Sequence, residues 1–152
     1  MNICSAFNIN SSGMTAQRYR MDIISENMAN AQSTRTEDGT PYRRKVVAFA
    51  EKGGSGSFVH ALNGALGYHG AGFSGSGVKI TGVYKDYKTE MKMVYDPSHP
   101  DANEDGYVTM PNVSIITEMT NMIDASRAYE ANSTAFNASK LMVQQGLQLG
   151  QS

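Results

Sequence analysis

Cysteine is almost absent from this chain of 152 residues, and tryptophan is absent altogether. The only cysteine is Cys4, so the chain can form neither an intrachain disulfide nor a metal site built from several cysteines. A single thiol close to a terminus is more often incidental than catalytic. The cysteine content therefore favours neither a disulfide scaffold nor a cysteine enzyme.

Excess charge and long apolar runs are lacking too. The formal net charge of -1 provides no basic stripe for nucleic acid and no polybasic patch for anionic lipid. No apolar run approaches the ~18 residues of a membrane span, so we expect no direct membrane insertion. The first residues, MNICSAFNINSSGM, lack the basic start, apolar core and cleavage site of a secretory signal. We therefore expect any export to follow a route without a cleaved signal peptide.

The length has room for one ordinary domain, and the hydrophobic content of 40% is somewhat low. The first of three segments, residues 1–35, predicts a helix followed by a turn. Phe7, Met14, Met21 and Met28 recur at intervals of seven, which is typical of a helix with a narrow apolar seam. Gly13 and the serines before it weaken the predicted helix.

The second segment, residues 36–111, changes to the period of strands. The stretches at 42–49, 78–84 and 91–95 are rich in β-branched and aromatic residues. Residues 52–77 between the first two are dense in glycine. The segment predicts a small antiparallel β element with one long flexible insertion.

The third segment, residues 112–152, predicts a long helix. An apolar heptad row runs through it, and its start falls at Pro111, Asn112 or Ser114, which the sequence does not separate. The row comprises Ile115, Met122, Tyr129, Phe136 and Val143.

The predicted fold class is therefore α+β: long N- and C-terminal heptad helices form an elongated coiled-coil-like pair, with the small antiparallel β element inserted between them. A helix of about 38 residues is roughly 57 Å long, whereas a globule of this size is roughly 40 Å across. Lys140 is the only charged side chain in residues 131–152. Neutral side chains on every face favour burial by neighbouring helices, and we expect the helices to be loosely ordered before assembly. The alternatives are a two-helix hairpin packed on the sheet, or a frayed C-terminal tail.

Specific strings resemble a known family. SSGMTAQRYRMDIISENMANAQSTRT, from Ser11 to Thr36, is similar to the N-terminal signature of bacterial flagellar rod and hook proteins. Three further strings are similar to basal-body rod proteins of that family, and only the glycine-rich stretch departs from the pattern. These strings are PYRRKVVAF at 41–49, VYDPSHPDANEDGYVTMPNV at 94–113 and SRAYEANSTAFNASK at 126–140.

The resemblance implies a structural subunit of the proximal rod, with no catalytic activity and no cofactor. It implies polymerisation in a helical array that transmits torque through the periplasm, and export through the flagellar type III apparatus. Its implied partners are other rod proteins and copies of itself, with no nucleic acid and no small-molecule substrate. Non-closing contacts between identical subunits generate such a filament. Another flagellar rod subunit, a coiled-coil adaptor and a small calcium-binding module are the alternatives.

Candidate assembly residues follow from the two heptad helices. The apolar members are expected to pack, and the asparagines either form hydrogen bonds to backbone or neighbouring helices, or are solvated or capping. The set is Phe7, Met14, Met21, Ile24, Asn27, Met28, Asn30, Ile115, Met122, Tyr129, Asn132, Phe136, Asn137 and Val143.

DANEDGYVTMPN at 101–112 approaches the spacing of an EF-hand loop. Asn112 at its twelfth position cannot supply the closing bidentate carboxylate, so we interpret the stretch as an acidic turn that leads into the C-terminal helix. Asp101 and Asp105 then become candidates for a subunit contact. Three other patterns are too weak to support a site: GAGFSG at 70–75, the near-consecutive Ser98, His99 and Asp101, and the isolated His60 and His69.

Overall fold

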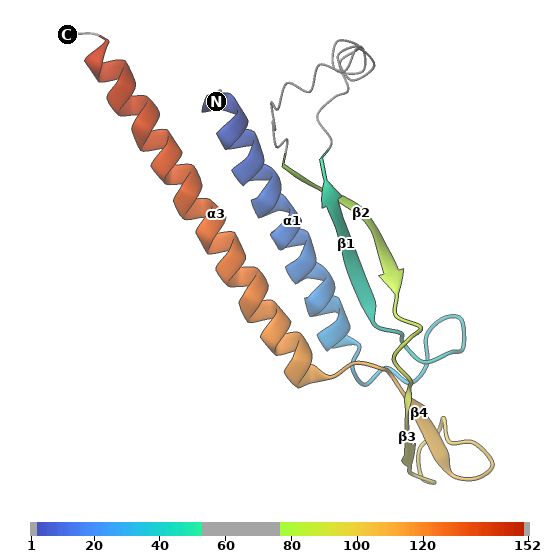
Figure 1. Ribbon diagram of the computed structural model, residues 1–152. Coiled ribbons are helices and arrows are strands. Elements are labelled where there is room, and N and C mark those ends of the chain that lie inside the picture. The colour runs from blue at the N-terminus through green and yellow to red at the C-terminus, as the bar shows by residue number, and fades with distance from the viewer. Residues whose placement is uncertain (1–2, 53–76, 151–152) are drawn as a thin grey trace, which may run out of the picture.

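A computed structural model describes residues 3–52 and 77–150. Its elements, labelled as in Figure 1, are two long helices and four short strands. The prediction of two long terminal helices around small antiparallel sheets is confirmed. The expected loop at 52–77 lies, apart from its two end residues, outside the described residues. The elements are α1 (Ile3–Ala29), β1 (Lys45–Glu51), β2 (Val78–Lys85), β3 (Lys92–Tyr95), β4 (Tyr107–Met110) and α3 (Ile115–Leu149).

The two helices lie side by side and antiparallel (Figure 1). The ring centroids of Phe7 and Phe136 are 4.9 Å apart, and further down the pair Asn27 donates to Glu118. With 27 residues, α1 is about 40 Å long, whereas the 35 residues of α3 extend about 52 Å. The C-terminal end of α3 therefore reaches past the first turn of α1 (Figure 1).

Ser114 occupies the N-cap position of α3 in an extended conformation. Its carbonyl oxygen accepts the first helical hydrogen bond, from the N–H of Glu118, at 2.9 Å. Its side chain makes no capping hydrogen bond. The structure thus selects Ser114 among the three possible starts, and it leaves the side chain of Asn112 available for another purpose.

The β residues form two separate two-stranded antiparallel sheets. In the first, Lys45 pairs with Lys85 and Glu51 with Val78, and a bulge between Ala48 and Phe49 leaves Thr81 without an opposite residue. In the second, β3 pairs with β4, from Lys92 opposite Met110 to Tyr95 opposite Tyr107. The interpretation of 101–112 as an acidic turn that leads into the C-terminal helix missed one feature, because residues 107–110 form strand β4.

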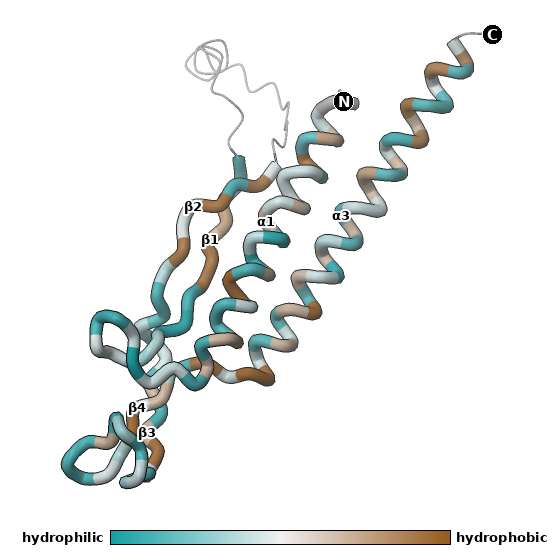
Figure 2. Tube along the Cα trace, turned by 180° about the vertical axis from the view of Figure 1, so that it is seen from behind, coloured by the Kyte–Doolittle hydropathy of each residue, from teal (hydrophilic) through white to brown (hydrophobic). Residues whose placement is uncertain are grey.

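Helix α1 is the middle layer of the molecule. It packs against α3 on one side and against β1 and β2 on the other, as Figures 1 and 2 both show. A two-stranded hairpin is only marginally stable alone, so β1 and β2 depend on this helix. The buried apolar residues are few: Ala16, Ile24, Tyr42, Val108, Val113 and Ala125. Within the described residues, neither helix is long and apolar enough to cross a bilayer.

Candidate functional site

A buried polar cluster joins α1, β1 and α3 at the base of the helix pair. Its first member is Asn27, of which 1% is exposed. The Asn27 amide donates to the backbone oxygen of Lys45 at 2.8 Å and to Glu118 Oε2 at 3.1 Å. Its oxygen accepts from the Lys45 N–H and from the Tyr42 hydroxyl, both at 2.9 Å. The side chain therefore satisfies both of its donors and its acceptor within the fold.

Glu118 is the second member, and it is fully buried in the first turn of α3. Its Oε1 accepts from Arg44 Nε at 2.9 Å and from Arg44 Nη2 at 2.7 Å. Charge-assisted hydrogen bonds of this kind compensate for much of the cost of removing a carboxylate from water. Glu118 thus fixes the start of α3 to the residue that precedes β1.

Asn112 links the same region to the segment after β2. Its Oδ1 accepts the Arg44 N–H at 2.8 Å, and its amide donates to the backbone oxygens of Asp86 at 2.9 Å and Thr89 at 3.1 Å. The Arg44 Nη1 also lies 3.7 Å from Asp86 Oδ2. The residues just before α3 are therefore held to both strands of the first hairpin, at the end where Lys45 pairs with Lys85.

Tyr42 completes the cluster from the loop between α1 and β1. Burial, and after it the negative charges of Glu26 and Glu118, together raise the pKa of its phenol to about 12. Glu26 in turn forms an ion pair with Lys45. The environment keeps Tyr42 a neutral donor to Asn27.

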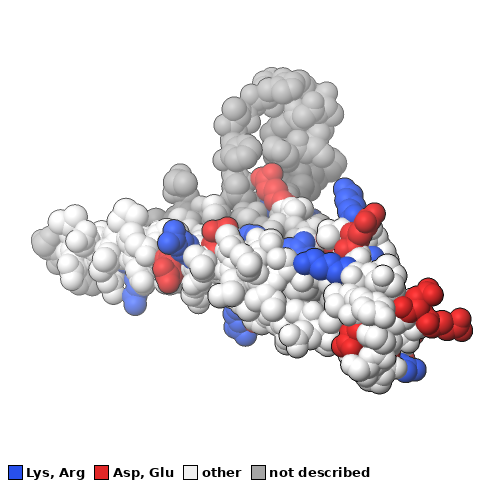
Figure 3. All heavy atoms as spheres, turned by 90° about the horizontal axis from the view of Figure 1, so that it is seen from below, with Lys and Arg blue, Asp and Glu red and all other residues white. Residues whose placement is uncertain are grey.

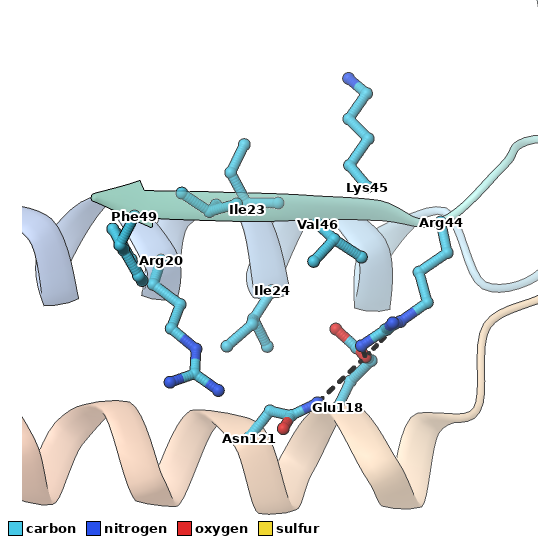
Figure 4. Close-up of a pocket in the computed structure, with 10 residues that line it drawn as sticks. Arg20, Ile23, Ile24, Arg44, Lys45, Val46, Phe49, Glu118 and Asn121 are labelled. Carbon is cyan, nitrogen blue, oxygen red and sulfur yellow. Dashed lines mark hydrogen bonds and ion pairs between the residues drawn. The ribbon is translucent and has the colours of Figure 1, made fainter. Parts of the chain in front are cut away.

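Figure 4 shows the pocket that adjoins this cluster between α1, β1 and α3. Its volume is about 190 Å³, and Ile23, Ile24 and Val46 form much of its wall. Glu118 already accepts hydrogen bonds from Arg44 and Asn121 (Figure 4), and also from Asn27. The polar groups here join three elements, because Asn27 of α1 and Arg44 before β1 both donate to Glu118 of α3.

Higher on the helix pair, small residues allow α1 and α3 to approach closely. Ala16 and Ala125 are buried, and a Cβ atom added to Gly13 would lie 2.9 Å from Asn132 Oδ1. Asn132 itself donates to the backbone oxygen of Ala128 at 2.8 Å. The seam of the pair is therefore narrow, and Phe7 and Phe136 close its upper part with an edge-on contact.

The predicted assembly residues fall into four groups in the structure. Ile24 and Asn27 are buried within the chain, and Phe7, Asn132 and Phe136 lie at the seam. Asn30 accepts from Ser33 and donates to the Glu26 backbone. The remainder are partly or fully exposed: Met14, Met21, Met28, Ile115, Met122, Tyr129, Asn137 and Val143.

Sequence reasoning selected Asn27 but missed the other members of the cluster and its neighbourhood, which are Glu118, Arg44, Tyr42 and Asn112. The one available signal was a glutamate among the apolar residues at the start of α3, where a charge is out of place unless it is paired. Nothing local indicates that its partner is 74 residues away. Only the packing of the three elements brings these groups together.

The acidic stretch at 101–112 forms hydrogen bonds and an ion pair with other residues of the same chain. Asp101 Oδ2 accepts from the Thr34 hydroxyl at 2.8 Å, and Asp101 Oδ1 lies 3.7 Å from Arg35 Nη1. Asn103 Oδ1 accepts the N–H of Tyr107 at 2.7 Å, which closes the hairpin. Among residues 3–52 and 77–150, no group of three acidic, histidine or cysteine side chains is arranged to hold a metal ion. GAGFSG, His60 and His69 lie outside the described residues.

Exposed apolar side chains gather on α3. Ser25 and Met28 of α1 and Met119, Met122 and Ile123 of α3 line a groove of about 430 Å³, which we call the methionine groove. Ile116 beside it is 80% exposed. Figure 3 shows that charged side chains are concentrated toward the loops and hairpins, whereas the far end of the helices is largely uncharged. This distribution is typical of a surface that other protein covers.

Comparisons with known proteins match both ends of the chain, and nearly its whole length, to flagellar basal-body rod proteins. The family described as "Flagella basal body rod protein" matches residues 7–35, and "Flagellar basal body rod FlgEFG protein C-terminal" matches residues 104–149. The flagellar basal-body rod protein FlgC of Borreliella burgdorferi is 43% identical over 97% of each chain. FlgC of Bacillus subtilis (strain 168) is 42% identical over 95% of this chain and 96% of its own. FlgC of Escherichia coli O6:H1 is 38% identical over 99% of this chain and all of its own.

Proposed function

This chain belongs to the FlgC family of flagellar basal-body rod proteins, and from that premise we propose that its terminal helices polymerise with neighbouring rod subunits. It is a structural subunit of the rod. In the proposal, the helices of the proximal rod form an elongated, coiled-coil-like shaft that transmits torque from the motor toward the hook and filament. The partners are other rod proteins and copies of this chain in a helical assembly.

The observation that carries the proposal is the uncovered apolar surface of α3. Ile116, Met119 and Ile123 near one end of the helix, and Leu141 and Met142 near the other, are all exposed in the single chain. Exposed apolar surface of this extent is unfavourable in water and is stabilised when a partner covers it. No charged residue of α3 follows Lys140, so burial of the C-terminal end of this helix leaves no charge there to desolvate.

The buried polar cluster suits the transmission of torque. Asn27, Glu118 and Arg44 fix the helix pair to the first β hairpin through hydrogen bonds of 2.7 to 3.1 Å. A load applied to the helices is then carried into the hairpins through directional bonds as well as through apolar contacts. We propose that the hairpins contact lateral neighbours around the shaft.

We also propose that the segments 1–35 and 112–152 act together as the axial part and 36–111 as the lateral part. The chain would reach the periplasmic rod through the flagellar type III export apparatus without cleavage of a signal peptide. A narrow helix pair with a small core suits such a route, because little buried surface has to be exposed when the chain unfolds for transport.

Protection of Ile116 from chemical labelling tests the proposed assembly. In a Cys4→Ser background, Ile116→Cys should react fully with a maleimide in the isolated chain, and at least tenfold more slowly in purified basal bodies. Denaturation of the basal bodies should restore the labelling, which controls for the presence of the thiol. Equal labelling of the free and assembled chain would contradict burial of this helix face.

A further inference from the structure

Two uncovered apolar surfaces lie at opposite ends of the helix pair. The first is the methionine groove, to which α1 contributes Ser25 and Met28. The exposed fraction is 52% for Met119 and 53% for Ile123, so its wall on α3 is open to solvent. None of the residues that line the groove is charged.

The second surface is the end of α3. The register set by Phe7 and Phe136 brings the start of α1 at Ile3 opposite the turn around Lys140. The residues that follow extend past α1 (Figure 1). Leu141, Met142 and Leu147 are between 58% and 65% exposed there, and no charged residue follows Lys140.

We propose that the end of α3, residues 141–149, of one copy docks in the methionine groove of a second copy. The inference rests on the proposed rod function and specifies the contact between subunits. The helix end of one chain cannot cover the groove of the same chain, because Ile123 and Leu141 are separated by about 27 Å of continuous helix. The contact is heterologous, so each added copy exposes a new groove and a new helix end.

The chemistry of the two surfaces matches. A helix end that presents apolar side chains to a groove between two helices is a common mode of recognition. Methionine side chains are flexible and adapt to an incoming apolar surface. Ser25, the one polar residue of the lining, is small and uncharged. Figure 2 shows hydrophobic residues at both places, in the lowest turns of α3 and again near its C-terminal end.

Cross-linking of two single-cysteine chains tests the contact. Full-length Met119→Cys and Met142→Cys proteins, each with Cys4→Ser, are mixed and treated with a short bismaleimide. We expect a heterodimeric product in at least fivefold excess over that of a matched mixture in which Thr120→Cys replaces Met119→Cys. Thr120 is also exposed, but it does not line the groove. Equal yields from the two mixtures would overturn the proposal.

Complementation of two charged variants provides a second measurement. Met119→Glu disrupts the groove and Met142→Glu disrupts the helix end, and both residues are exposed, so the monomer should keep its fold. Each variant alone should associate at least tenfold more weakly than the wild type in sedimentation experiments. A mixture should recover dimers, because one intact groove and one intact helix end remain.

The outcome also separates this inference from the rod function. If the mixture gives no dimers while the wild-type chain is protected in basal bodies, the second copy is the wrong occupant and the rod function stands. Cross-links from Met119→Cys to another rod protein alone, in purified basal bodies, would likewise overturn the proposed pairing. If the wild-type chain is absent from basal bodies, the proposed function itself fails.

Discussion

At the scale of single residues, the fold depends on polar side chains whose partners are distant in sequence. Asn27 could be selected from the sequence because it is a polar residue within an apolar helical pattern, and such residues often make specific hydrogen bonds. Its contacts with Lys45 and Glu118 span 18 and 91 positions. Helical periodicity describes only near neighbours, so it could identify the residue but not the cluster.

Replacement of Asn27 by alanine should destabilise the protein strongly. The change removes the partner of four groups, including the buried Glu118 carboxylate and the Lys45 backbone. Buried groups left without hydrogen bonds cost about 1 to 3 kcal/mol each, partly relieved by water entry, so we expect a loss of about 3 kcal/mol in urea unfolding. Asn137→Ala, at an exposed position, is the control and should change stability by less than about 0.5 kcal/mol.

Glu118→Gln keeps the shape of the side chain and removes its charge. Arg44 would then lack its main counter-charge at the junction of α3 and β1. Removal of one partner of a buried ion pair costs about 3 kcal/mol, so the midpoint of urea unfolding should fall well below that of the wild type. The exposed Glu130→Gln tests whether loss of any acidic charge on α3 has this effect. Similar losses in both variants would show that the buried pair is not responsible.

Tyr42 should make stability depend on alkaline pH. The pKa of its phenol is about 12 in the folded protein, whereas an unperturbed tyrosine has a pKa of 10.0. The folded state therefore favours the neutral phenol. This contribution is complete below pH 10 and is lost as the pH rises toward 12. The free energy of unfolding should therefore fall by up to about 2 kcal/mol more in the wild type than in Tyr42→Phe over this range. Tyr87→Phe, at an exposed position, should retain the wild-type slope.

At the scale of elements, the two helices were predictable because each repeats its apolar pattern over several turns. The position of α1 between α3 and the first hairpin was not predictable. A narrow heptad stripe suggests one contact face, whereas α1 contacts both of these elements. Strand β4 was missed because its residues follow acidic positions that resemble a metal loop. In the structure, Val108 of that strand is buried and Asp101 bonds to Thr34.

Two glycines in helices should respond oppositely to alanine. At Gly146 of α3 an added Cβ meets no atom within 4 Å, so Gly146→Ala should stabilise the helix by up to about 1 kcal/mol. At Gly13 the same atom meets the Asn132 amide at 2.9 to 3.2 Å, and displacement of that amide threatens its bond to Ala128. Gly13→Ala should therefore gain nothing or lose about 1 kcal/mol, as measured by thermal unfolding. The double variant with Asn132→Ala should recover the gain, and a stabilising single Gly13→Ala would refute the close seam.

At the scale of the whole molecule, removal of the two ends of the helix pair should have different effects on the stability of the monomer. The first β hairpin depends on α1, because Ile24 and Asn27 are buried at the junction with β1. The end of α3 lies past the start of α1, and its exposed leucines and methionine contribute little to the core. In the proposed assembly, the contacts between subunits and the stability of the monomer would therefore depend on different segments, which the heptad pattern did not distinguish because it continues through both.

Removal of residues 141–152 should consequently separate folding from assembly. The shortened chain should unfold in urea within about 0.5 kcal/mol of the wild type, because residues 141–150, apart from the half-buried Val143, are exposed in the monomer. Removal of residues 1–31 should instead abolish cooperative unfolding, since it takes away the helix on which β1 and β2 pack. In cells, the C-terminally shortened chain should remain folded yet fail to enter basal bodies and support motility. A stable chain that still assembles without this end would place the subunit contacts on the hairpins and not on α3.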